Sequence, residues 1–194
     1  MYRLPIIFAV VMITLIAGIL LIFGGHKTPN TSNTASNNPA LVLKPLPDYA
    51  NTDAVITLTT DGHINGDDLH RQIRITVSQN KRELDIIQGY SGTVVSSQTY
   101  YNTEDAYNVF LRSIYLSGFT LNSKAKPAAP ASELGQCATG FRYIFDVNQD
   151  GNDLSRLWTS SCATGTFGGN SDLVQSLFQA QIPNYQKTAD SVEL

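Results

Sequence analysis

The 194-residue sequence has little charge and little cysteine. Lysine, arginine, aspartate and glutamate together make up 15% of the chain, and the formal net charge is −3. A disordered or nucleic-acid-binding tail would need more charge and fewer apolar residues, so we expect no nucleic-acid partner. Two cysteines are also too few for a disulfide-dense miniprotein, and they cannot on their own complete a four-ligand structural zinc site.

Sequence motifs of common enzyme classes are missing as well. The G-x-S-x-G turn that exposes a catalytic serine does not occur. The glycine-rich segment 165–171 lacks the Gly-Lys-Ser/Thr ending of a phosphate-binding loop, so we interpret it as a turn followed by a helix cap. These absences favour a non-enzymatic role without settling it, and no cofactor is predicted.

Residues 4–25 form a run without any charged residue. As a helix with a rise of about 1.5 Å per residue, the run would be roughly 33 Å long, which is enough to span a bilayer. A cleavable signal peptide has a shorter apolar region, of about 7 to 15 residues, and a small-x-small cleavage site. No such site follows here, so we expect residues 1–25 to form an uncleaved, single-pass membrane anchor.

The rest of the chain divides into a linker, a domain and a tail. Residues 26–52 are predicted to be a flexible linker, because residues 28–40 are polar and uncharged and the part that follows contains Pro45 and Pro47. An α+β domain is expected at 53–189, followed by a tail at 190–194. The linker and the cysteines favour a cytoplasmic amino terminus and an extracytoplasmic domain at the cell membrane.

Short alternating apolar runs begin at about residue 54, as is typical of half-buried strands. Positions 73, 75 and 77, for example, are apolar and alternate with arginine and threonine. Six strands are predicted, at residues 54–60, 70–78, 82–87, 93–100, 141–147 and 154–159.

Two helices are predicted among these strands. The first begins after Asn102 or Thr103 and the second near Asn170 or Ser171, since these residues cap helices and apolar residues at helical spacing follow. The second helix must end before Pro183. The predicted order is β-β-β-β-α-β-β-α, which favours an α+β domain with both helices on one face of an antiparallel sheet.

Cys137 and Cys162 flank the last predicted strand pair, so pairing the two strands brings both sulfur atoms to the same end of the hairpin. A structural disulfide is the simplest interpretation. A redox-active pair would be expected to show C-x-x-C spacing, which is absent. The remaining alternative is a pair of buried free thiols.

The segment from residue 146 to 152 matches the first half of a calcium-binding loop, D-x-N-x-D-G. Position twelve, where such loops carry a bidentate glutamate, is Leu157. We therefore predict a hairpin turn, with weak calcium binding as the less favoured alternative. The candidate ligands are Asp146, Asn148, Asp150 and Asn152.

A second polar cluster lies between the first two predicted strands. His63, Asp67, Asp68 and His70 are the residue types that bind zinc or transfer protons. Their spacing matches no metal motif, and a polar turn needs similar residues, so we favour a solvated loop. Catalysis by these four residues remains a less favoured hypothesis.

We therefore expect a membrane-anchored, extracytoplasmic binding or assembly module of the cell envelope. It would meet a protein or envelope partner through an exposed sheet edge or an aromatic patch. The candidates for such a patch, although packing in the core or at its rim is favoured for each, are Tyr90, Tyr100, Tyr101, Trp158 and Tyr185. The first alternative is an envelope enzyme or metal-dependent hydrolase that uses the His63–His70 loop. The second is an inhibitor-like or immunity module that presents the proline-rich segment 127–130.

Overall fold

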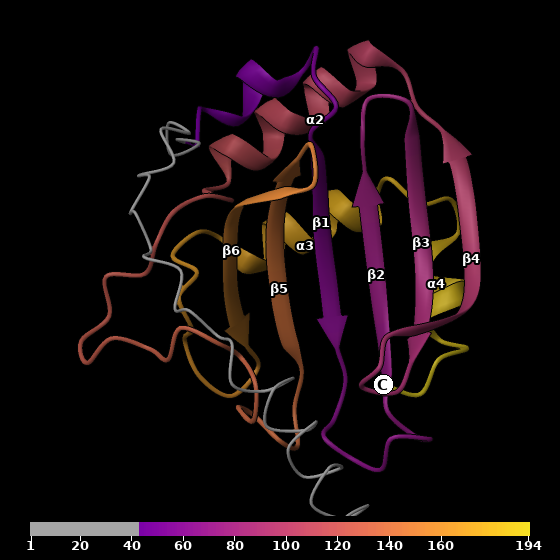
Figure 1. Ribbon diagram of the computed structural model, residues 1–194, viewed down its shortest axis with the longest axis vertical. Helices are drawn as coiled ribbons and strands as arrows, with labels where there is room; N and C mark the ends of the chain where they lie inside the picture. Colours follow the sequence, from indigo (N-terminus) through magenta and orange to yellow (C-terminus); the bar gives the residue numbers. More distant parts are fainter. Residues whose placement is uncertain (1–42) are drawn as a thin grey trace, which may run out of the picture. The chain divides into compact units, whose positions relative to one another are not determined.

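The computed structural model describes residues 43–194 (Figure 1). The predicted anchor and the linker up to residue 42 lie outside this range. Among the residues described, no helix combines the length and apolar character needed to cross a bilayer. The elements in chain order are η1 (Leu46–Tyr49), β1 (Val55–Asp61), β2 (Arg71–Val77), β3 (Lys81–Gln88), β4 (Thr93–Tyr101), α2 (Glu104–Leu116), β5 (Arg142–Gln149), β6 (Asn152–Ser160), α3 (Ser171–Gln179) and α4 (Tyr185–Ala189).

The strands form one antiparallel sheet in the order β4-β3-β2-β1-β5-β6. The first four strands make a meander, and β5 pairs with the side of β1 that the meander leaves free. Leu58 on β1 lies opposite Ile75 on β2 and Phe145 on β5, which sets the three strands in register. This arrangement confirms the predicted α+β class with an antiparallel sheet.

Both long helices begin where a side chain caps their first turn. The Thr103 hydroxyl accepts a hydrogen bond from the Ala106 amide at 3.2 Å, and the Asn170 side chain accepts one from the Leu173 amide at 3.0 Å. Each cap satisfies an amide that has no partner within its helix. The predicted starts of these two helices are therefore confirmed.

The core lies between the helices and one face of the sheet. Alternate strand residues point towards the helices, and Ile56 and Leu58 on β1 are fully or almost fully buried there. Phe110 of α2 meets Phe178 of α3 edge to face, with ring centroids 5.1 Å apart. In Figure 1, α3 and α4 lie behind the sheet and α2 crosses its upper end. The opposite face therefore carries the other set of alternate residues.

Three short segments extend the domain beyond the predicted strands and helices. Leu46 and Tyr49 of η1 are buried, so this part of the segment expected to be linker packs into the core. The five-residue helix α4 was not predicted. Val192 and Leu194, in the segment expected to be a tail, pack against the core. Each segment contributes apolar side chains that pack against the hydrophobic core and are thereby removed from water.

Candidate functional site

A buried polar cluster closes one end of the sheet. It consists of Asp61 at the end of β1, Arg142 at the start of β5 and His70 just before β2. The strand register places Asp61 directly opposite Arg142. His70 is fully buried and Arg142 is 2% exposed. Buried charges are stable only when paired and hydrogen-bonded, which is the arrangement found here.

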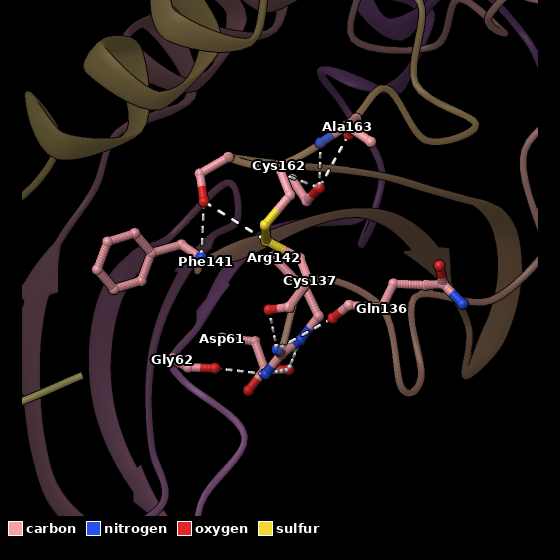
Figure 2. The surroundings of a disulfide bond; sticks show 10 residues. Asp61, Gly62, Gln136, Cys137, Phe141, Arg142, Cys162 and Ala163 are labelled. Carbon is pink, nitrogen blue, oxygen red and sulfur yellow. Dashed lines mark hydrogen bonds and ion pairs between the residues drawn. A yellow bond between two sulfur atoms is a disulfide. The ribbon is translucent and has the colours of Figure 1, made fainter. Parts of the chain in front are cut away.

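The guanidinium of Arg142 holds this end of the sheet together (Figure 2). Its Nε and Nη2 atoms both lie 2.7 Å from Asp61 Oδ2, and Nη2 also donates to the Gly62 carbonyl. Nη1 donates to the carbonyls of Gln136 and Cys137 at 3.3 and 3.2 Å. One side chain therefore links β1, the loop after it and the loop before β5. This bonding pattern fits a structural role.

Both ring nitrogens of His70 face oxygen acceptors. Nε2 lies 2.9 Å from Asp61 Oδ1, and Nδ1 lies 3.0 Å from the His63 carbonyl. A ring protonated at both nitrogens would donate to both oxygens. The Tyr90 ring stacks on His70, with centroids 4.1 Å apart. These contacts leave neither nitrogen directed towards solvent, where a substrate or metal ion would approach.

The other candidate catalytic side chains have separate partners. The His63 ring lies beside the Phe141 ring, with centroids 5.1 Å apart. Asp67 Oδ1 accepts a hydrogen bond from the Tyr90 amide at 2.7 Å, which fixes the loop to the β3–β4 turn. Asp68 contributes its backbone carbonyl, not its carboxylate, to bonds with Arg71 and Gln88.

No cluster of three or more histidine, cysteine, aspartate or glutamate residues in the range 43–194 has a geometry that could hold a metal ion. This statement covers the loop from His63 to His70 and the segment from Asp146 to Asn152. His63, Asp67 and His70 instead contact ring, backbone and carboxylate atoms of their neighbours, as described above. Their arrangement supports the shape of the sheet end.

The disulfide predicted from the sequence is present between Cys137 and Cys162, whose Cα atoms are 5.6 Å apart. It joins the loop before β5 to the loop after β6 (Figure 2). The Ser161 hydroxyl beside it accepts a hydrogen bond from the Phe141 amide at 2.9 Å. Since Arg142 binds the Cys137 carbonyl, one half of the cross-link contacts the buried polar cluster directly.

The segment with calcium-loop character forms the two-residue turn between β5 and β6. Gln149 pairs with Asn152, and Asp150 and Gly151 between them both have positive φ angles, 52° and 74°. This is the geometry of a tight hairpin turn of the type that favours Asn-Gly and Asp-Gly. The Asn152 side chain donates to the carbonyls of Gln149 and Asp150, so it points back at the turn.

Two carboxylates near this hairpin have raised pKa values. Burial raises the pKa of Asp146, although Arg156 opposes the shift with bonds at 3.0 and 3.2 Å. The exposed Asp150 also has a raised pKa, because the Asp53 carboxylate hydrogen-bonds with its protonated form and repels its ionised form. Ionisation of both groups at neutral pH therefore opposes folding to some extent.

The two edges of the sheet differ in how their backbone groups are satisfied. At the β6 edge, the Trp158 amide donates to the Thr166 hydroxyl at 3.0 Å, and the Trp158 carbonyl accepts from the Phe167 amide at 2.9 Å. The segment after β6 therefore covers the outward backbone of this strand at Trp158, near its carboxy-terminal end.

The β4 edge lacks such a cover among the described residues. The Asn102 amide donates to Asn80, so from residue 96 to the end of β4 the even-numbered residues bond to β3 and the odd-numbered ones face outward. Ser97 and Thr99 thus present their amide and carbonyl groups to the outside of the sheet. Neither makes a backbone hydrogen bond to any other described segment.

The composition of β4 leaves this edge unprotected. The strand TVVSSQTYY contains no charged residue and no proline, two of the devices that block strand addition. Val94, Val95 and Tyr101 are exposed. A bulge opposite Ile86 and Ile87 is the one irregularity in the pairing of this strand. The sequence predicted the strand but not its edge position, because strand order depends on contacts between distant segments.

The aromatic residues suggested for a partner patch do not gather on one surface. Tyr90 and Tyr101 are exposed, whereas Trp158 is buried and Tyr100 and Tyr185 pack partly against the core. Comparison of the chain with protein-family models finds no matching family, and comparison with curated proteins finds no matching relative. Function therefore has to be inferred from the geometry of the domain.

Proposed function

We propose that this chain is a membrane-anchored, extracytoplasmic binding or assembly module of the cell envelope, and that its protein partner adds an extended segment to β4. The observation that carries the proposal is the uncovered edge at Ser97 and Thr99. A segment laid antiparallel to β4 would satisfy these backbone groups, which is a common mode of peptide recognition.

The side chains around this edge suit a polypeptide partner. Alternate residues of an added strand would lie beside Val94 and Tyr101, which are 48% and 78% exposed. Covering such apolar surface favours association, because its burial is worth about 25 cal/mol per Å² before the entropic costs of binding are subtracted. The strand itself has no charge, so an incoming segment would meet no like charge on β4. The partner is therefore expected to supply a neutral, β-branched or aromatic segment.

The proposed location rests on two features. The uncharged run 4–25 has the length of a membrane-spanning helix, and the amino terminus would remain in the cytoplasm. The Cys137–Cys162 disulfide supports placement of the domain in an oxidising compartment, because such bonds are rare in the cytosol. Together they support a domain held at the outer face of a cell membrane.

The contacts of His70 favour binding over hydrolysis. A general base or a zinc ligand needs a ring nitrogen that can reach the substrate or the ion. Both nitrogens of His70 already lie within 3.0 Å of protein oxygens. Substitution of both His63 and His70 by alanine would abolish a hydrolase that depends on this loop. The binding function should persist in any such variant that folds.

Cross-linking of the full-length protein in its native membrane tests the proposal. A carboxy-terminal tag would recover the protein, and residues 1–50 alone would serve as the anchor-only control. Ser97→Pro removes one outward amide without removing a bond to β3, and Ser97→Thr keeps that amide as the matched control. Thermal unfolding would confirm that both variants fold.

We expect one stoichiometric partner with the wild type and with Ser97→Thr. Capture should fall about fivefold or more with Ser97→Pro, as loss of one net hydrogen bond of about 1 kcal/mol implies. A second copy of the chain as the captured species would identify self-assembly through the same edge. Equal capture by Ser97→Pro and Ser97→Thr would contradict the proposal, as would capture by the anchor-only control.

A further inference from the structure

A groove crosses the face of the sheet that the helices leave uncovered. Its volume is about 560 Å³, which is within the range of roughly 300 to 1,000 Å³ typical of small-molecule sites. The central strands β1 and β2 form much of the floor, because alternate residues of each strand point away from the helices. These floor residues include Thr57, Thr59, Arg74 and Thr76.

One wall of the groove is the segment 133–135, which belongs to the long connection between α2 and β5. Two contacts hold this connection over β6. Arg156 Nη2 lies 2.6 Å from Glu133 Oε1, and Trp158 Nε1 donates to the Pro130 carbonyl at 3.0 Å. The wall is therefore fixed by side chains of the sheet it covers.

Apolar side chains rise at the rim of the same groove. Leu134 is 77% exposed on the wall, and Ile64 and Tyr90 are 39% and 53% exposed at one end. Tyr90 is held in place by its hydroxyl, which donates to the Asn65 carbonyl at 2.9 Å. A ligand bound on the groove floor could therefore contact the apolar side chains at the rim.

Most acidic groups that line the groove are paired with cations. Asp61 is bound by Arg142 at 2.7 Å. Glu133 and Asp146 share Arg156, with nitrogen–oxygen distances of 2.6 and 3.0 Å. These pairs reduce the negative charge that an anionic ligand would encounter.

Four hydrogen-bond donors on the groove floor have no partner among the described residues. Arg74 makes no ion pair and no side-chain hydrogen bond among residues 43–194, although Asp85 lies opposite it in the β2–β3 register. The hydroxyls of Thr57, Thr59 and Thr76 likewise have no hydrogen-bond partner in this part of the chain. One guanidinium and three hydroxyls on adjacent strands match the acceptor oxygens of an oxyanion.

We propose that Arg74 and the flanking threonine hydroxyls bind the carboxylate of a ligand whose apolar part contacts Leu134 and Tyr90. The carboxylate would lie over the middle of the floor. The remaining acidic lining residue, Asp153, accepts a hydrogen bond from the Asn148 side chain at 3.0 Å. This site is separate from the β4 edge and does not depend on the function proposed for that edge.

Calorimetric titration of the full-length protein in nonionic detergent tests the site. Each probe is an acid paired with its amide. The small-molecule pair is 3-phenylpropionate and 3-phenylpropanamide. The peptide pair is N-acetyl-Ala-Phe with a free or an amidated carboxyl terminus. Fluorescence of Trp158, the one tryptophan in the chain, reports occupancy beside the wall. The variants are Arg74→Gln, Thr76→Val and, as a matched control, Arg112→Gln on the exposed side of α2.

We expect at least one acid to bind about tenfold or more tightly than its amide, because charge-assisted bonds to a guanidinium are strong. Arg74→Gln should abolish this preference, Thr76→Val should weaken it, and Arg112→Gln should leave it unchanged. Binding of the peptide acid alone would identify a peptide terminus as the source of the carboxylate. Equal binding of acid and amide, a preference retained by Arg74→Gln, or no binding of either acid at about 10 mM would overturn the proposal.

Discussion

Asp61 and Arg142 face each other across adjacent strands, and their side chains meet at 2.7 Å in the buried end of the sheet. Replacement of Asp61 by asparagine would leave the Arg142 guanidinium buried without its counterion. Loss of one partner from such a pair costs about 3 kcal/mol or more. We therefore expect Asp61→Asn to lower the free energy of unfolding by about this amount in urea titrations.

Asp68→Asn provides the control for this prediction. Asp68 lies in the same loop region, but its carboxylate is exposed and makes no ion pair among the described residues. Its substitution should change stability by less than about 0.5 kcal/mol. Similar effects of the two substitutions would contradict the role assigned to the Asp61–Arg142 pair.

The Cys137–Cys162 disulfide closes a loop with a sequence separation of 25. A cross-link that closes a loop of this length lowers the entropy of the unfolded chain, which raises the free energy of unfolding by about 3.5 kcal/mol. The double variant Cys137→Ser, Cys162→Ser should lose roughly this stability in denaturant titrations. A reducing agent should lower the stability of the wild type and leave that of the double variant unchanged. Equal stability of the oxidised and reduced wild type would refute this prediction.

The β5–β6 turn needs a residue that tolerates positive φ at Gly151. No atom lies within 4 Å of where a Cβ would be, so Gly151→Ala tests backbone strain without a steric clash. We expect a loss of about 1 kcal/mol. The expected result is a lower midpoint in urea with an unchanged m-value; an unchanged midpoint would show that the turn tolerates alanine.

Asp150→Asn should have the opposite effect at neutral pH. Asparagine tolerates the φ of 52°, and it removes a carboxylate whose pKa is raised by a hydrogen bond between its protonated form and Asp53 and by repulsion between the two charges. Because the folded-state pKa is raised, the wild type loses stability as pH rises above the ordinary value of 3.8. The variant should therefore melt at a higher temperature at pH 7 and lose this advantage near pH 3. A constant difference at both pH values would contradict the repulsion.

The buried hydroxyl of Tyr107 should make the stability of the domain depend on pH in alkaline solution. Burial raises its pKa well above the ordinary value of 10.0, and its hydroxyl donates to the Ala54 carbonyl at 2.8 Å. The Tyr107 hydroxyl loses its proton more readily in the unfolded chain than in the folded one, so the free energy of unfolding should fall as pH rises past about 10. Tyr107→Phe should show a shallower fall between pH 9 and 11 in denaturant titrations. Part of the slope should remain, since burial also raises the pKa values of Tyr143 and Tyr185.

Local sequence patterns predicted the elements whose causes are local. The alternation at 73, 75 and 77 led to β2, and the Thr103 cap led to α2. The five-residue helix α4 has too short an apolar pattern to be distinguished from a loop. The cysteine pairing was predicted because both residues flank one hairpin, where strand pairing brings them together.

The functional features that depend on distant contacts were missed. Asp61 and Arg142 are 81 residues apart, so no spacing rule connects them. The residue types of the His63–His70 loop suggested a catalytic or metal site. The packing of this loop at the end of the sheet instead depends on Tyr90 and, through Asp61, on Arg142, which are distant in the sequence. The exposed edge at β4 follows from the order of the strands, which required knowing that β5 pairs with β1.

Hydrogen exchange at individual amides tests the binding role of β4 most directly. The amides of Ser97 and Thr99 should exchange rapidly in the free full-length protein, whereas the Trp158 amide on the covered edge should be protected. After the partner is captured, exchange at Ser97 and Thr99 should slow by about tenfold or more, with no change at Trp158. Unchanged rapid exchange at Ser97 and Thr99 in the complex would contradict strand addition at β4.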